Sequence, residues 1–193
     1  MYLSSIKNNV TSQVLEILLT LPTPNTIMEE STISDLKRFP CYIRQETPIW
    51  CIPATVEAVM KYLDPSLVLE QKSLVEEYIK SRDFGTICYA NFKDAVLEPR
   101  FGTEFCFTIE IFPEFEDWKN AIKKFVLLNL PPLISVRVQA GAHMAAILGF
   151  TDSLFLSYDP AIGCKPVFIE KFRDKFLADV LIIKQRSQLI PSK

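Results

Sequence analysis

The sequence has only one histidine, His143, in 193 residues, and its cysteines form no Cys-x-x-Cys pair. A zinc site built from cysteine and histidine is therefore poorly supported, and we expect no metal and no cofactor. The five widely spaced cysteines are Cys41, Cys51, Cys88, Cys106 and Cys164. An odd count leaves at least one free thiol in a monomer, and free thiols are most simply explained by a reducing compartment. We accordingly predict a cytoplasmic location.

Long apolar runs and an excess of one charge are also lacking. Nowhere do about 18 consecutive apolar residues occur, so we expect no membrane span. The apolar stretch over 14–21 is short, is interrupted by Glu16 and lacks a small-residue cleavage site, so we expect no export signal. The 23 acidic and 21 basic residues are interspersed, and no basic stripe is available to neutralise phosphates. We therefore expect neither nucleic acid nor a membrane as a partner, and the sequence says nothing of oligomeric state.

About half of the residues are apolar, which suits one domain with a substantial core. Residues 1–40 are typical of an N-terminal extension, with a short helix over 14–19 and a proline-rich break over 21–26. This extension either packs on the domain or covers its site and regulates access. Residues 41–193 form the domain. Apolar periodicity predicts helices over 51–63, 66–81, 89–97 and 115–128, and strands over 104–111, 133–138, 143–150, 154–159 and 180–183. A glycine-containing turn is expected over 82–86, and a mixed loop and short helix over 164–176. Helices first and a sheet second predict an α+β fold.

The stretch from Gln45 to Leu63 carries the first candidate site residues. Its apolar residues after Cys51 recur at three- and four-residue steps, and Pro53 fits the first turn of a helix. This geometry places the Cys51 thiol at a helix N-terminus, where amides and the helix dipole stabilise a thiolate nucleophile. Gln45 can donate a hydrogen bond to an oxyanion. The alternative for Cys51 is a buried structural cysteine, since free cysteine is among the most commonly buried residues.

His143 is the base that Cys51 requires if the thiol works with an imidazole. A three-residue turn over 151–153 would pair Phe150 with Leu154 and put Ala145 opposite Asp159, so that His143 and Asp159 become diagonal neighbours on one face. Asp159 would then orient the imidazole. A two- or four-residue turn would place Asp159 on the other face. The alternative for Asp159 is a cap of the turn formed with Pro160.

These motifs together resemble a known family. Gln45 six residues before Cys51 and its apolar helix, Ala142-His143 before an apolar strand, and Tyr158-Asp159-Pro160 are similar to the double-glycine (bacteriocin-processing) branch of the papain-like cysteine peptidases, over about residues 41–185. The signature of the plant and lysosomal enzymes is absent. The resemblance implies a papain-like cysteine peptidase fold, in which a helical half with the nucleophile at a helix start packs on a C-terminal antiparallel sheet. It also implies Cys51 as nucleophile, His143 as base, Asp159 as its orienting partner and Gln45 in the oxyanion hole.

One residue departs from that family's pattern. Ile52 stands where the family usually has glycine, and its branched side chain is expected to crowd the acyl pocket and alter substrate preference. Trp50, beside the nucleophile, is a candidate wall of a substrate groove, with ordinary core packing as its alternative. The sequence contains nothing like a transporter ATPase, so export-coupled leader cleavage is not expected.

The leading functional hypothesis is a cysteine peptidase-like thiol hydrolase that cleaves a peptide or amide bond in a peptide or protein substrate. Acyl transfer by the same triad is the closest alternative, because an amine can replace water as acceptor. A catalytically inactive peptide-binding module on the same fold is another. A redox sensor that pairs Cys51 with Cys41 or Cys88 is disfavoured, since no resolving cysteine is adjacent in the sequence.

Overall fold

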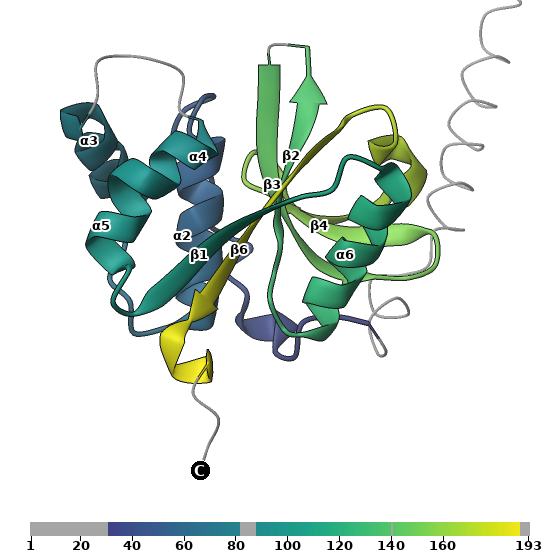
Figure 1. Cartoon of the computed structure of the whole chain (residues 1–193), viewed down its shortest axis with the longest axis horizontal. Coiled ribbons are helices and arrows are strands. Elements are labelled where there is room, and N and C mark those ends of the chain that lie inside the picture. Colours follow the sequence, from purple (N-terminus) through teal and green to yellow (C-terminus); the bar gives the residue numbers. More distant parts are fainter. Residues whose placement is uncertain (1–30, 82–87, 140, 190–193) are drawn as a thin grey trace, which may run out of the picture. The chain divides into compact units, whose positions relative to one another are not determined.

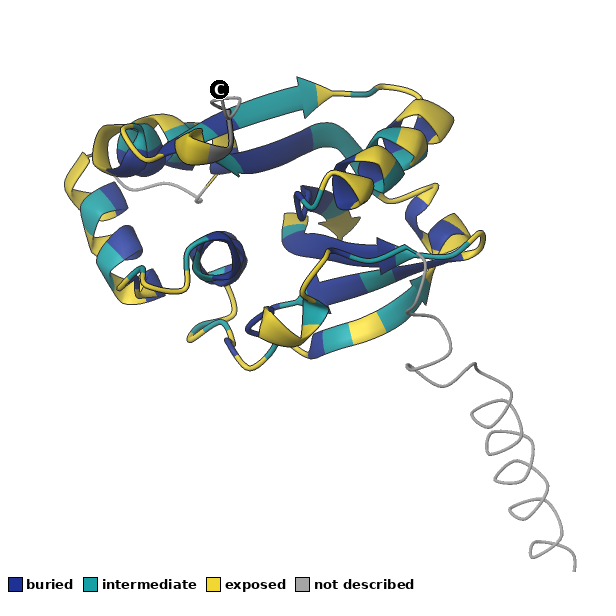
Figure 2. Cartoon of the chain, turned by 90° about the horizontal axis from the view of Figure 1, so that it is seen from below, coloured by how far each residue is buried: buried dark blue, intermediate teal, exposed yellow. Residues whose placement is uncertain are grey.

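Helices dominate the first half of the described chain. The structure is a computed structural model and describes residues 31–81, 88–139 and 141–189. The α-helices are α2 (Cys51–Leu63), α3 (Gln71–Ser81), α4 (Tyr89–Phe92), α5 (Glu98–Phe101) and α6 (Phe115–Leu127). Helix α2 starts and ends where the apolar periodicity predicts. It is buried on every side, since all of its residues except Lys61 are buried, and Figure 2 shows it end-on as a dark-blue ring.

A six-stranded antiparallel sheet forms most of the second half (Figure 1). Its strands are β1 (Phe105–Ile111), β2 (Leu133–Val138), β3 (Gly141–Phe150), β4 (Leu154–Asp159), β5 (Gly163–Phe168) and β6 (Phe176–Gln185). They lie in the order β1-β6-β2-β3-β4-β5, so the last strand in the sequence lies inside the sheet. The predicted α+β fold, helices first and antiparallel sheet second, is confirmed.

Helices cover both faces of the sheet. Trp118 of α6 meets Phe155 of β4, with ring centroids 6.1 Å apart. Tyr158, also on β4, contacts Phe39 at 5.1 Å, and Phe39 contacts Tyr62 of α2 at 5.7 Å. Because side chains alternate between faces along a strand, Phe155 and Tyr158 point to opposite sides. The buried aromatic rings therefore join the sheet to α6 on one face and to α2 on the other.

The β3–β4 hairpin reaches the predicted register in an unexpected way. At the turn, Phe150 pairs with Phe155, so four residues rather than the predicted three separate the partners. A register shift between Ile147 and Gly149 then inserts one extra residue in β3, as a β-bulge does. Beyond the bulge Ala146 pairs with Tyr158, which is the register predicted for this part of the hairpin. The bulge thus cancels the longer turn before the strands reach His143 and Asp159.

Two of the predicted helices differ from the structure. Helix α3 begins at Gln71 rather than at Ser66, because the side chain of Asp64 accepts hydrogen bonds from the Ser66 amide and hydroxyl and stabilises a turn there. The third predicted helix continues past Pro99 to Phe101, through a π-helical turn at Lys93–Leu97 that accommodates the proline. Its end at Phe101 buries that ring in the core.

The loop predicted after Cys164 contains β5 and a 3-10 turn at Ile169–Phe172. Strand β5 is an edge strand, where Pro166 is tolerated because one side of the strand needs no donor. Strand β6 is also longer than the predicted 180–183.

Residues 31–40, the described end of the predicted extension, pack against the sheet and α2. Thr32 forms a bridge with Gly149, and the Ile33 amide donates to the Leu148 carbonyl at 2.9 Å. Gly149 allows this approach, since a Cβ there would lie 2.7 Å from the Thr32 methyl group. The predicted helix over 14–19, the break over 21–26 and the turn over 82–86 lie outside the described residues.

Candidate active site

The Cys51 thiol lies at the first residue of α2, 8% exposed. Trp50 precedes the helix without capping it by its side chain, so the amides of the first turn lack a side-chain acceptor. Backbone groups of Ile52 and Met144 hydrogen-bond to the sulfur. Met144 belongs to β3, so the sulfur sits where the start of the helix meets the sheet. Two backbone amides there are placed to stabilise a thiolate.

His143 lies between the thiol and a carboxylate. Its Nε2 is 2.9 Å from Oδ1 of Asp159, and it hydrogen-bonds to the thiol of Cys51. With Nε2 on the carboxylate, Nδ1 is the ring nitrogen left for the sulfur. The same Oδ1 accepts from the Ala161 amide at 2.9 Å. Asp159 therefore both caps its turn and contacts the imidazole, so the two interpretations of this residue are compatible.

These contacts shift the pKa of all three side chains. The hydrogen bond to Asp159, followed by the one to Cys51, raises the pKa of His143 to about 9. Burial acts to raise the pKa of Cys51, but the hydrogen bonds from His143 and the Met144 backbone lower it below its ordinary value. Burial also acts against the ionised form of Asp159, yet the hydrogen bond with His143 lowers that pKa overall. The lowered pKa of Cys51 and the raised pKa of His143 both favour the ion pair of thiolate and imidazolium.

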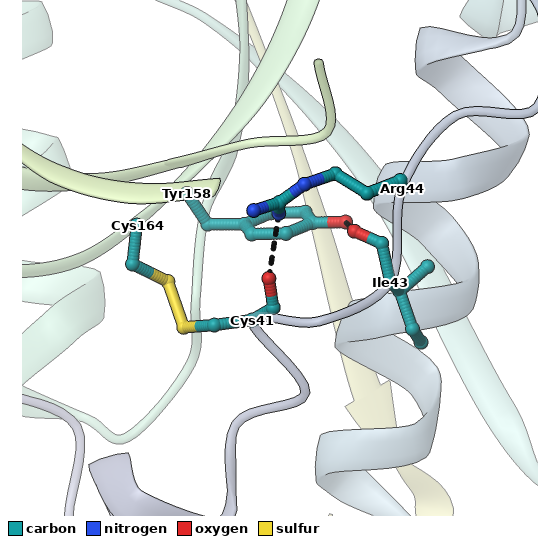
Figure 3. The surroundings of a disulfide bond; sticks show 5 residues. All are labelled: Cys41, Ile43, Arg44, Tyr158 and Cys164. Atoms are coloured by element: carbon teal, nitrogen blue, oxygen red, sulfur yellow. Dashed lines mark hydrogen bonds between the residues drawn. A yellow bond between two sulfur atoms is a disulfide. The ribbon is translucent and has the colours of Figure 1, made fainter. Parts of the chain in front are cut away.

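A disulfide and hydrogen bonds hold the loop that carries Gln45 against β4 and the turn after it. Figure 3 shows the disulfide and the side chains around it. Cys41 and Cys164 form a disulfide, Arg44 donates to the Cys41 carbonyl at 2.7 Å, and the Tyr158 hydroxyl donates to the Ile43 carbonyl at 2.9 Å. The Gln45 amide donates to the Pro160 carbonyl at 3.0 Å. The loop before Cys51 is thus fixed to β4 and the turn after it, which carry Tyr158 and Asp159.

The disulfide corrects one prediction. The free-thiol account is wrong for Cys41 and Cys164, whereas Cys51, Cys88 and Cys106 are free. The two partners are 123 residues apart in the sequence, so no local pattern indicates their pairing. The bond removes the free-thiol argument for a reducing compartment, and a cytoplasmic location stays a prediction.

Gln71 is a site-supporting residue that the sequence analysis missed. Its buried side-chain amide contacts the peptide groups on both sides of Gln45: Nε2 donates to the Arg44 carbonyl at 2.7 Å, and Oε1 accepts from the Glu46 amide at 3.0 Å. The backbone amide of Gln71 in turn donates to Glu57 of α2 at 3.0 Å. Such long-range contacts leave no motif in a sequence. Gln71 links the Gln45 loop to the helix that starts with Cys51.

The side-chain amide of Gln45 donates one of its two N–H groups in a hydrogen bond within its own loop. Its Nε2 donates to the Thr47 carbonyl at 2.9 Å, while Oε1 is buried without a partner among the described residues. Because a carbonyl can only accept, Thr47 determines which end of the amide faces it. The amide carries two protons, so a second N–H remains for another acceptor.

Trp50 and Ile52, on either side of Cys51 in the sequence, occupy different environments. Trp50 is half-buried, whereas Ile52 is 7% exposed and belongs to the apolar core. This burial favours a packing role for the Ile52 side chain.

Across the described ranges, no group of three or more histidine, cysteine, aspartate or glutamate side chains is placed to hold a metal. Within the same part of the chain, no helix is sufficiently long and apolar to cross a membrane.

Solved structures of known proteins share this fold. A double-glycine motif protease from an AMS/PCAT transporter, crystallised with its leader peptide, matches with a TM-score of 0.55 and 21% identity over 74% of this chain and 89% of that one. A putative C39-like peptidase from Bacillus anthracis matches with a TM-score of 0.57 and 11% identity, over 81% and 98%. The peptidase domain of Streptococcus ComA matches with a TM-score of 0.53 and 14% identity, over 73% of this chain and 95% of that one.

The sequence by itself is less informative, since no protein-family model and no curated protein matches it. The structural matches are nevertheless to the kind of protein that the sequence motifs resemble, and they cover 73–81% of this chain. The chain therefore has the papain-like α+β fold of the double-glycine (C39) peptidase domains.

Proposed function

We propose that the chain is a thiol hydrolase that cleaves a peptide or amide bond. The observation that carries this proposal is the position of His143, hydrogen-bonded to Cys51 on one side and to Asp159, at 2.9 Å, on the other. A thiol at a helix start, an imidazole and a carboxylate in this order supply a nucleophile, a proton carrier and its orienting partner. The similarity of the fold to peptidase domains agrees with this chemistry.

Each residue has a role in the proposed reaction. The Cys51 thiolate attacks the carbonyl carbon, and the electron pair of the C=O bond moves to oxygen. The second N–H of Gln45 and the backbone N–H of Cys51 hold that oxyanion. As the tetrahedral intermediate collapses, the imidazolium of His143 protonates the leaving amine. Neutral His143 then takes a proton from water, which attacks the thioester and restores the thiol. Half-buried Trp50 is placed beside the acyl group.

Iodoacetamide labelling of the native protein tests the nucleophile. We expect buried Cys51 to react faster than exposed Cys88 at a pH well below about 8.5, the pKa of an ordinary thiol, because its thiolate persists there. Peptide mass spectrometry follows each cysteine separately, so Cys88 is an internal control. His143→Ala should remove the advantage of Cys51 while circular dichroism reports an unchanged fold. Labelling of Cys51 no faster than of Cys88 would contradict the proposal.

Cleavage of a library of internally quenched peptides tests the reaction itself. The wild-type protein should cleave some members, and Cys51→Ala should cleave none, because removal of the nucleophile leaves no acyl-enzyme route. An acyl-enzyme that mass spectrometry detects on Cys51 would identify the covalent step. Cleavage that survives in Cys51→Ala would show that another site is responsible.

A further inference from the structure

A cavity of about 690 Å³ adjoins the proposed catalytic residues, and His143 and Asp159 both line it. Its volume is within the range of ligand-binding sites. Val136 pairs with His143, and Lys165 pairs with Ser157 on the next strand. Since paired residues of neighbouring strands share a face, these cavity walls lie on the face of the sheet that carries the imidazole. A molecule bound here would therefore lie beside the reacting groups.

The cavity combines an apolar floor with a positively charged rim. Its floor consists of buried or half-buried apolar side chains, namely Val136, Ala145, Val167 and Phe172. Its rim carries four exposed cations, namely Arg137, Lys165, Lys171 and Lys175. Asp159 is the one acidic residue among the described lining residues, and it already contacts His143. The cavity is therefore strongly cationic although the chain has a formal net charge of -2.

No carboxylate of the described residues lies within 4.0 Å of the charged groups of the rim cations, although Lys165 is near enough to Asp159 to act to lower the pKa of that carboxyl. Lys171 contacts the Phe168 ring at 5.9 Å. The neighbouring cation Arg173 differs, because it pairs with Glu170 at 2.7 Å and Glu116 at 3.0 Å. Like charges around one cavity repel, and a bound anion relieves that repulsion.

We propose that this cavity binds an acidic segment of the peptide substrate. Aspartate or glutamate side chains would pair with the rim cations, and intervening apolar side chains would cover the floor. This charge complementarity would orient the chain of the substrate past His143 and speed its capture. The assignment of the segment to a substrate rests on the proposed function, whereas binding of an acidic peptide to the cavity does not require catalysis.

Fluorescence anisotropy on the full chain carrying Cys51→Ala tests binding without turnover. The probes are a labelled peptide in which glutamate alternates with small apolar residues, and its twin with glutamine at every glutamate position. We expect the glutamate peptide to bind about tenfold more tightly at low salt, and added salt to reduce this difference. The double substitution Arg137→Glu/Lys171→Glu should abolish the difference. Lys37→Glu/Lys72→Glu, on exposed lysines outside the cavity, makes the same change in net charge and should preserve it.

The outcomes separate this inference from the proposed function. Equal binding of the two peptides, or unchanged selectivity in Arg137→Glu/Lys171→Glu, would overturn the inference even if the protein cleaves peptides. Selective binding of the glutamate peptide without Cys51-dependent cleavage would support the inference about the cavity and overturn the proposed peptidase function. If phosphatidylserine vesicles bind through Arg137 and Lys171 and the glutamate peptide does not bind, the inference is overturned. The ligand of the cavity is then an anionic membrane surface and not a peptide.

Discussion

Removal of the Cys41–Cys164 disulfide should destabilise the fold strongly. The bond closes a loop between residues 123 apart in the sequence. In the chain-entropy model, a loop of this length restricts the unfolded chain enough to contribute about 5 kcal/mol to the free energy of unfolding. For a protein of this size that corresponds to a fall in Tm of about 10–20 °C. We therefore expect Cys41→Ala/Cys164→Ala to melt within this interval below the wild type in differential scanning calorimetry.

The matched control is Cys88→Ala/Cys106→Ala, which removes two free cysteines and leaves the disulfide intact. Its Tm should stay near that of the wild type, and only the wild type and this control should lose stability on reduction. Titration of the unfolded, unreduced wild-type protein with a thiol reagent should find three free thiols. Five free thiols, or equal Tm values for the two double variants, would refute the reasoning.

Three predictions concern the site. Cleavage should rise with pH as Cys51 loses its proton and fall as His143 loses its own near pH 9, which kcat/KM measured across pH will show. Asp159→Asn removes the largest cause of the raised His143 pKa, so the alkaline fall should move to lower pH, a shift that loss of folding alone would not produce. Gln71→Glu keeps the acceptor for the Glu46 amide but loses the donor to the Arg44 carbonyl, so kcat should fall about tenfold with KM little changed as the Gln45 loop loosens. Equal kcat in this variant and the wild type would show that the loop does not depend on Gln71.

Local patterns in the sequence predicted the elements that position the thiol and the imidazole. The helix over 51–63 was predictable because its apolar residues recur at helical steps, and this face packs against β3 and β6. The contact between His143 and Asp159 was predicted from hairpin register, but by an incomplete argument. The four-residue turn alone would have separated the two residues, and the bulge between Ile147 and Gly149 restores the register. The sequence analysis did not predict this bulge, although a glycine within a strand, here Gly149, is typical of one.

Contacts between distant segments could not be predicted in this way. The Cys41–Cys164 bond and the Gln71 amide both act across the fold, and each depends on backbone positions that only the folded chain defines. Strand β5 escaped prediction because Lys165 and Pro166 break its apolar alternation, which an edge strand permits. Elements with one buried face were thus predictable, whereas cross-links and edge elements were not.

The position of β6 inside the sheet has a consequence for biosynthesis. Residues Phe176–Gln185 pair with β1 on one side and β2 on the other, so both neighbours have unpaired edges until this late segment leaves the ribosome. Unpaired edges and uncovered apolar helices are the usual sites at which nascent chains associate wrongly. Helix α2 is translated early, yet the sheet that buries it is completed last. The growing chain therefore already contains Cys51 and the apolar helix α2 before the strand that completes their sheet has been made.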